Sequence, residues 1–441
     1  MTERSNNTRK DKVRELQVKL YLAAKRSPDR RFHALWDRIL RRDVLQRAWQ
    51  QVRENRGSAG VDRITIAQIE GEGVQAFLDG LQQELCEQRY RPQPARRVFI
   101  PKPGRSERRP LGIPAVKDRV CQTAAKLILE PIFEADFRGC SFGFRPKRSA
   151  HQALDEIKRE VMRGRRWVID ADIRGFFDAL DLEILEQLLC ERISDRRVLK
   201  LLGSWLRAGV LEGETLLRPE VGSPQGSPIS PLLANVYLNA LDRVWEDRHG
   251  ELGVLVRYCD DLVILCRTKA RAEAALRELR ALLAELRLEL ADAKTRLVCL
   301  DNDGEGSFDF LGFHHQMVES FSKRGWHFLA RWPSAAATRA ARQRIRELTD
   351  RRLLRLSVEE VVANLSRFLA GWAGYFRRGN STTTFHKLDL YTAERLARWI
   401  GKRHKSRHPL TYGYWRLRQE RFFGLRPLVG RVHHGVAHAA R

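Results

Sequence analysis

Two adjacent aspartates, Asp260 and Asp261, interrupt a long apolar run near the middle of the chain. The run extends from Gly253 to Cys266, and most of its other residues are aliphatic. Strand-forming segments on both sides of a two-residue polar tip predict a tight β-hairpin with both carboxylates at the tip. Burying two like charges is costly unless a cation compensates them, and a divalent metal ion does so well. The alternative is an exposed acidic turn, since Asp is common in turns.

The charge of the chain narrows the choice of partner. Its 441 residues carry a formal net charge of +26. Such an excess favours a polyanion, because each phosphate contact releases condensed counterions. A ribosomal-type or membrane-surface protein is the alternative. The hydrophobic content of 43%, with 10 Trp and 19 Phe, instead indicates a large folded protein with a real core.

The cysteine pattern bears on the compartment. The seven cysteines are scattered, and no Cys-x-x-Cys pair occurs, which argues against a zinc ribbon and against a secreted disulfide framework. No apolar stretch approaches the ~18–20 residues of a membrane-spanning helix, and the N-terminal residues lack the apolar core of a signal peptide. We therefore expect a cytoplasmic, nucleoid-associated protein with no membrane partner.

A second acidic segment follows a short apolar strand that begins at Trp167. Asp170 and Asp172 lie on one face of this strand, because strand side chains alternate. If the strand adjoins the hairpin, three carboxylates would hold two metal ions about 3.5–4 Å apart, as in phosphoryl-transfer enzymes. Spacing alone does not choose between Asp170 and Asp172. An Asp that caps a turn at the strand end is the alternative.

Two further segments have a clear local pattern. The Pro- and Gly-rich stretch from Gly222 to Asn235 predicts a rigid loop that enters a helix at Pro231, with Ser230 as N-cap. Few large side chains in this loop would allow close approach of a substrate. Residues 270–290 have Leu at every third or fourth position and predict one long helix.

Eight short motifs follow one another along the chain. They are Arg97-Val-Phe-Ile-Pro-Lys102, Arg109-Pro-Leu-Gly-Ile-Pro114, Ser141-Phe-Gly-Phe-Arg-Pro146, Asp172-Ile-Arg-Gly-Phe-Phe177, Pro224-Gln-Gly226, Tyr258-Cys-Asp-Asp261, Lys294-Thr295 and Phe310-Leu-Gly-Phe313. In this order they resemble reverse transcriptases of the bacterial group II intron type. Each motif alone is weak, whereas eight in the family's order are specific. The resemblance extends from about Asn55 to Phe376.

The resemblance implies an α+β, right-hand polymerase fold with fingers, an antiparallel-sheet palm, a helical thumb and a basic C-terminal extension. We expect an N-terminal helical extension with a loop, then the reverse transcriptase fingers and palm, then a helical thumb or maturase domain, and finally a basic tail. The corresponding segments are residues 1–62, 63–330, 331–400 and 401–441.

Matching the motifs also implies a set of catalytic residues. Asp172, Asp260 and Asp261 resemble the family's metal ligands for two Mg²⁺ ions, with Mn²⁺ as a substitute, and Asp170 then becomes a neighbour of the site. Phe177 resembles the aromatic residue that blocks a ribose 2′-hydroxyl and thereby selects dNTPs; a core position is its alternative.

Four polar residues resemble the family's nucleotide contacts. Lys102 and Arg109 match the cations that hold the incoming triphosphate, and charge-assisted bonds to phosphate suit both side chains. Gln225 matches the residue that contacts the nucleotide beside the template. Lys294 matches the lysine that protonates the leaving pyrophosphate. A solvated surface position is the ordinary alternative for each cation.

The resemblance implies an RNA-directed DNA polymerase that is also a maturase for group II intron splicing and mobility. Its partners would be an RNA template, a DNA primer, dNTPs and a second copy in a homodimer. One alternative is an RNA-binding splicing cofactor with secondary polymerase activity. Another is a domesticated relative in phage defence, CRISPR spacer acquisition or DNA repair. Cys259 departs from the family, which usually has Ala at this position beside the primer end.

Overall fold

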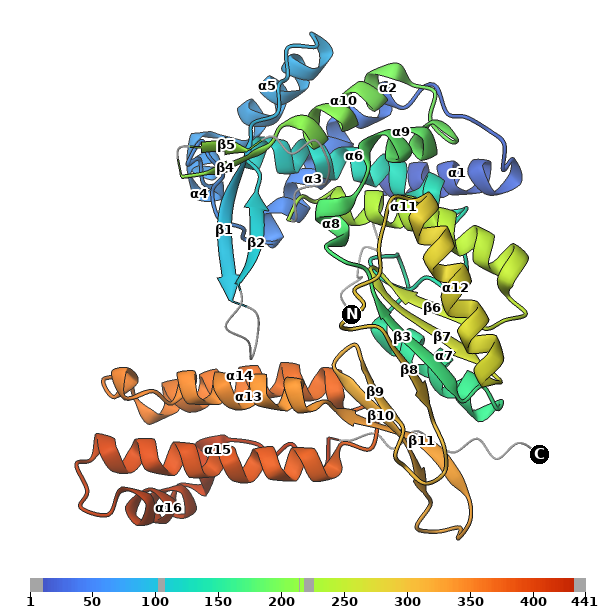
Figure 1. The fold of residues 1–441 in the computed structure, drawn as a ribbon. Coiled ribbons are helices and arrows are strands. Elements are labelled where there is room, and N and C mark those ends of the chain that lie inside the picture. Colours follow the sequence, from blue (N-terminus) through green and yellow to red (C-terminus); the bar gives the residue numbers. More distant parts are fainter. Residues whose placement is uncertain (1–10, 102–107, 214, 218–225, 432–441) are drawn as a thin grey trace, which may run out of the picture. The chain divides into compact units, whose positions relative to one another are not determined.

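The computed structural model describes residues 11–101, 108–213, 215–217 and 226–431 (Figure 1). The chain divides into two compact units. The first comprises Met1–Ile100, Arg108–Ala153 and Ala171–Arg296, and the second comprises Pro101–Glu107, Leu154–Asp170 and Leu297–Arg441. These limits differ from those of the four expected segments, which therefore remain a proposal.

Helices make up most of the first unit. They are α1 (Lys12–Arg26), α2 (Trp36–Ile39), α3 (Arg42–Glu54), α4 (Ile66–Glu72), α5 (Val74–Cys86), α6 (Val116–Glu134), α8 (Phe176–Ala179), α9 (Leu182–Cys190), α10 (Arg196–Arg207), α11 (Ser230–Val244) and α12 (Lys269–Glu285). Helix α6 packs against α1, α2, α3 and α11 (Figure 1). Most of its residues are buried, so it forms the centre of this helical layer.

The strands of the described residues form three sheets. Strands β1 (Ala95–Pro101), β2 (Arg108–Ile113), β4 (Val210–Glu212) and β5 (Thr215–Leu217) have the order β2-β1-β4-β5. Strands β3 (Trp167–Asp172), β6 (Val254–Tyr258), β7 (Asp261–Cys266) and β8 (Arg296–Cys299) have the order β6-β7-β3-β8. Strands β9 (Ser307–Phe310), β10 (Phe313–Glu319) and β11 (His327–Pro333) form an antiparallel sheet of order β11-β10-β9.

The hairpin predicted around the aspartate pair is present, but its tip lies one residue earlier than expected. Strands β6 and β7 pair antiparallel with Tyr258 opposite Asp261, so the two-residue turn consists of Cys259 and Asp260. Asp261 is the first residue of β7. The pairing register therefore separates the two carboxylates into a turn position and a strand position.

The helix expected over residues 270–290 ends early, at Glu285. Beyond α12 the chain runs beside the end of β3, where Leu290 forms a bridge with Ile173. The Ala291 amide donates to the Asp172 carbonyl oxygen at 2.8 Å. Leu288 and Leu290 stay buried in this extended segment, which explains why the leucine pattern outlasts the helix.

The start of α11 also shifts by one residue. The helix begins at Ser230, and Ile229 occupies the N-cap position without a side-chain hydrogen bond. Ser230 is therefore a helical residue and not the N-cap. Pro231 lies in the first turn, where its missing amide hydrogen costs nothing.

The second unit joins the β9–β11 sheet to a set of long helices. These are α13 (Ala335–Leu348), α14 (Val358–Phe376), α15 (Thr382–Arg403) and α16 (Pro409–Gln419), with most of α7 (Ala150–Met162). Helix α13 packs against α14 and α15, and α15 packs against α16 (Figure 1). A capping box between Ser357 and Glu360 starts α14.

The segment expected as a basic tail from residue 401 is folded in its described part. Its expected limit falls inside α15, and α16 lies along that helix. Gly413 makes this close approach possible, because a Cβ there would lie 1.9 Å from the Ala397 carbonyl oxygen. Composition alone indicated a tail because it does not register such contacts. Among the described residues, no helix has the length and apolar character needed to cross a bilayer.

Candidate active site

The β6–β7 turn holds Cys259, the first of its two residues, in a strained conformation. Cys259 has a φ of 59°, in the left-handed region, which costs a non-glycine residue roughly 1–2 kcal/mol. Its side chain is buried, whereas Asp260 is half-buried and Asp261 is exposed. Such strain persists only where the surrounding structure determines the backbone.

Asp172 and Lys294, both identified from the motifs, lie together. Asp172 ends β3, and the Lys294 ammonium forms an ion pair with its carboxylate. The backbone bond between Ala291 and Asp172 brings the Lys294 segment to this place, and the Lys294 amide donates to the Ala291 carbonyl oxygen at 2.9 Å. The Asp172 side chain is 24% exposed and that of Lys294 59%, so solvent partly screens the pair.

Asp260 interacts electrostatically with both Asp172 and Lys294. Desolvation by burial raises the pKa of the Asp260 carboxyl above its usual range, and the negative charge of Asp172 raises it further. The cations Arg109 and Lys294 act in the opposite direction and lower this pKa. Three other sequence-predicted residues thus lie within electrostatic reach of Asp260: one carboxylate, Asp172, and two cations, Arg109 and Lys294.

Of the other residues predicted to contact the nucleotide, the structure describes Phe177 but not Lys102 or Gln225. Phe177 is half-buried, with its ring centroid 5.2 Å from that of Phe176. Phe176 is fully buried and also faces Tyr237, so it belongs to the core. Lys102 and Gln225 lie outside the described residues, so the roles expected for them stay predictions.

Two glycines bring other motifs into close contact. At Gly143, a Cβ would lie 2.6 Å from the Cys259 amide nitrogen and 3.0 Å from its Sγ. The Ser141–Pro146 motif therefore packs directly against the β6–β7 turn. Gly226 has a φ of 109°, and a Cβ there would lie 2.5 Å from the Gly112 carbonyl oxygen. The glycine that ends the Pro224–Gly226 motif thus lies against the motif that carries Arg109.

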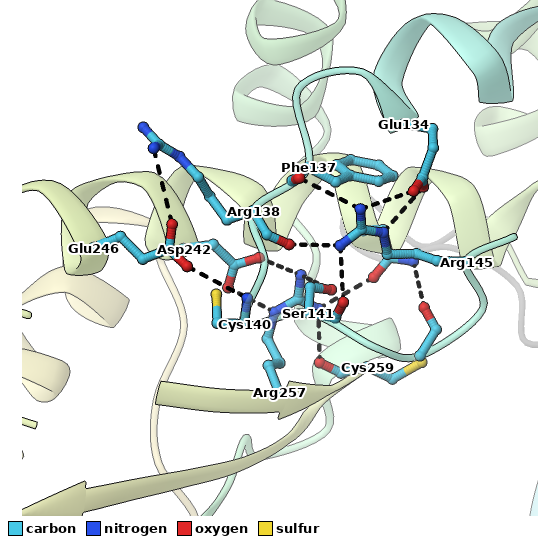
Figure 2. Close-up of polar contacts among 12 residues, drawn as sticks. Glu134, Phe137, Arg138, Cys140, Ser141, Arg145, Asp242, Glu246, Arg257 and Cys259 are labelled. Atoms are coloured by element: carbon cyan, nitrogen blue, oxygen red, sulfur yellow. Dashed lines mark hydrogen bonds and ion pairs between the residues drawn. The ribbon is translucent and has the colours of Figure 1, made fainter. Parts of the chain in front are cut away.

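The sequence motifs did not point to Arg257 on β6, whose buried guanidinium lies behind the turn. Its guanidinium bonds both carboxylate oxygens of Asp242 on α11, at 2.8 and 2.5 Å. It also donates to the side-chain oxygen of Asn235, the hydroxyl of Ser141 and the carbonyl oxygen of Cys259, at 3.1, 2.8 and 3.0 Å (Figure 2). Its charge within an otherwise apolar strand is the sequence feature that could have identified Arg257.

The same network continues through the loop that carries the Ser141–Pro146 motif. Arg145 forms a two-pronged pair with Glu134 and donates to the carbonyl oxygens of Phe137, Arg138 and Ser141 (Figure 2). This loop is consequently held from α6 on one side and from β6 on the other.

The Cys259 thiol adds no charge to the site. Burial raises the pKa of this thiol to about 12, and the neighbouring Asp260 charge contributes in the same direction. The side chain is therefore a neutral, small group under the turn at neutral pH.

The donor set near the turn suits a hard cation. Asp172, Asp260 and Asp261 offer only carboxylate oxygens, which Mg²⁺ prefers over nitrogen or sulfur. Asp172 already attracts one cation, Lys294. Within the described part of the chain, no three acidic, His or Cys side chains converge in a ready-made metal cluster.

Two family models match successive parts of the chain. Residues 100–315 match the family "Reverse transcriptase (RNA-dependent DNA polymerase)", and residues 338–420 match "Group II intron, maturase-specific domain". Among solved structures, a chain of a "Partial Cas6-RT-Cas1--Cas2 complex" is similar at 25% identity, with a TM-score of 0.35 over 57% of this chain and 42% of that one.

The matches to two curated relatives span different shares of those relatives. "Protein YkfC" of Escherichia coli (strain K12) is 34% identical over 71% of this chain and 90% of the relative. "Group II intron-encoded protein LtrA" of Lactococcus lactis subsp. cremoris is 39% identical over 49% of this chain, but the match spans only 35% of LtrA. With both family matches following in order along the chain, this protein belongs to the group II intron-type reverse transcriptase and maturase family.

Proposed function

We propose that this RNA-directed DNA polymerase extends a DNA primer on an RNA template through Asp172, Asp260 and Asp261, as ligands of two Mg²⁺ ions, with Mn²⁺ as a substitute. The observation that carries the proposal is that β3, which ends at Asp172, lies beside β7, which begins at Asp261, with Lys294 in an ion pair with Asp172. Bound metal ions would activate the primer hydroxyl and offset charge on the transferring phosphate.

The protein's own groups would act on the nucleotide around these carboxylates. Arg109, together with Lys102, binds the triphosphate through charge-assisted hydrogen bonds. The Lys294 ammonium, beside Asp172, donates a proton to the leaving pyrophosphate. The Phe177 ring excludes a ribose 2′-hydroxyl and thereby selects dNTPs, while Gln225 contacts the nucleotide beside the template.

The finer architecture is part of the same proposal. The β6-β7-β3-β8 sheet would be the palm, the β2-β1-β4-β5 sheet with its helices the fingers, and α13–α16 the thumb and maturase domain. The match to a maturase-specific domain over residues 338–420 supports the last assignment. Basic helices there would bind group II intron RNA through its phosphates, during both splicing and intron mobility. We further propose a nucleoid-associated protein that is able to form a homodimer.

A carboxylate variant tests the polymerase site. Asp260→Asn with Asp261→Asn should lower primer extension on an RNA template by roughly 1,000-fold or more, because charge stabilisation of the transition state is lost. Asp303→Asn, at an exposed position, is the matched control and should keep the wild-type rate. Unchanged extension by the double variant would show that these carboxylates are not the site.

Splicing of intron RNA by the same variant separates the two activities. RNA binding would depend on the basic helices and not on the carboxylates, so splicing should persist while cDNA synthesis stops. Loss of both activities in a folded variant would contradict this separation.

A further inference from the structure

We propose that Arg257 is a positioning residue for the polymerase site. By bonding the Cys259 carbonyl oxygen, it sets where the β6–β7 turn presents Asp260. The inference rests on the proposed function of Asp172, Asp260 and Asp261. It assigns to a residue behind the turn a part in catalysis that needs no contact with substrate.

The hydrogen bonding of Arg257 is complete. A guanidinium has five N–H donors in a fixed plane, and all five are used: two by Asp242 and one each by Asn235, Ser141 and Cys259. These acceptors lie on α11, on the Ser141–Pro146 motif and on the turn itself. One rigid fork therefore ties the turn to two other segments.

The backbone of Arg257 is fixed as well. Its amide donates to the Cys140 carbonyl oxygen at 2.8 Å, and its carbonyl oxygen accepts from the Phe142 amide at 2.9 Å. The fork thus starts from an anchored point, since β6 is held to the neighbouring loop at the very residue that carries it.

The bond to Cys259 has a direct consequence for Asp260. The Cys259 carbonyl belongs to the planar peptide that leads into Asp260, so fixing this oxygen fixes the positions of the Asp260 nitrogen and Cα. Cys259 is in the left-handed region, where it needs external support. Gly143 packs against its amide nitrogen, while Arg257 holds its carbonyl oxygen. The turn is therefore held at both ends of its strained residue.

The buried Arg257–Asp242 pair allows an effect on the turn to be distinguished from an effect on stability. The Arg257 and Asp242 side chains are both fully buried. Well-packed apolar residues commonly replace such a pair without loss of stability. An apolar pair cannot donate to the turn carbonyl, however, and lysine lacks the planar fork. The donor geometry is thus what only arginine supplies here.

The deciding experiment replaces the pair by apolar residues, Arg257→Met with Asp242→Leu. In primer extension on an RNA template, we expect kcat to fall about 10- to 100-fold and half-saturation by Mg²⁺ to rise about tenfold, the scale found when groups behind metal ligands are removed. The Kd for a primer–template duplex should stay at the wild-type value. Wild-type kcat and Mg²⁺ dependence in this folded variant would overturn the proposal, as would weakened duplex binding with kcat unchanged.

Two further variants keep the result interpretable. Arg257→Lys retains a cation against Asp242 but not the planar fork of donors. It should also lower kcat and raise the Mg²⁺ concentration for half-saturation. If the double variant does not fold, this variant tests the role of Arg257. Arg192→Met removes another buried arginine, paired with Asp136 at 3.1 Å, and should lower stability without altering Mg²⁺ dependence. If Asp260→Asn with Asp261→Asn extends primers normally, the proposed site itself fails, a result distinct from failure of Arg257 alone.

Discussion

Two buried basic residues on strands, one in each unit, differ in their hydrogen bonding. Arg257 on β6 is fully buried, and each of its side-chain donors has an acceptor. His315 on β10 is equally buried, yet neither ring nitrogen has a hydrogen-bond partner among the described residues. Its ring instead stacks on Phe308, with centroids 4.8 Å apart.

The two side chains also differ in the direction in which the protein shifts their pKa. Desolvation lowers the pKa of Arg257, but the Asp242 carboxylate more than reverses this, and the net pKa is raised. The pKa of His315 is lowered to about 3, mainly by desolvation and also by the nearby side chains of Arg331 and His314. Burial is therefore tolerated in two ways: arginine stays charged with a full set of partners, and histidine gives up its proton.

The largest test of this contrast removes Arg257 alone. Arg257→Met leaves Asp242 buried without its cation and should lower the free energy of unfolding by about 3–5 kcal/mol. Urea unfolding followed by Trp fluorescence measures the loss. Arg42→Met breaks an exposed pair with Asp79, with side chains 61% and 48% exposed, and should cost no more than about 1 kcal/mol. Similar losses in both variants would remove the distinction between buried and exposed pairs.

Lowering the pH tests the other half of the contrast. Unfolded histidine titrates near pH 6.5, whereas His315 in the fold has a pKa of about 3, so the unfolded chain takes up the proton first. The stabilising contribution of neutral His315 is fully present above about pH 6.5. It is lost as the pH falls toward 3, by about 2 kcal/mol between pH 6.5 and pH 5.

Unfolding at several pH values, compared between wild type and His315→Leu, isolates this contribution. The Leu variant should lack that part of the pH dependence. His314→Leu is the matched control, because His314 lies partly exposed beside Asp309 at 2.6 Å. It should retain most of the contribution of His315, since desolvation is the largest cause of the lowered pKa. Equal slopes in wild type and His315→Leu would refute the assignment.

The smallest expected effect is that of His315→Leu at pH 7.5. Removing two unsatisfied nitrogens is favourable, while losing the ring contact with Phe308 is unfavourable. The net change in the free energy of unfolding should stay within about 1 kcal/mol, measured by the same urea titration. A loss as large as that of Arg257→Met would mean that His315 has a partner of similar importance.

Much of the candidate site was predictable from local patterns. The Asp172 strand and the β6–β7 hairpin follow from apolar runs that end in carboxylates. The hairpin tip was misplaced by one residue, because the turn is set by pairing of Tyr258 with Asp261 and not by which residues are polar. The end of α12 was missed for a similar reason, since Leu290 is buried beside β3 and not on a helix face.

Other features depend on contacts between distant segments. Gly143 and Arg257, more than 100 positions apart, both contact the same turn residue, Cys259. Glycine and arginine have many common uses, so neither residue type predicts such a contact by itself. The folding of residues 409–419 onto α15 likewise depends on how closely two backbones approach.

By itself, the amino-acid sequence determined the family, through eight motifs in order, and the acidic and basic residues from which a polymerase site is built. The tertiary structure alone decided which of these residues meet and what holds them. Side-chain chemistry and spacing are local properties, whereas the position of Asp260 depends on a buried guanidinium whose acceptors come from three separate segments. Only packing brings those acceptors within hydrogen-bond distance.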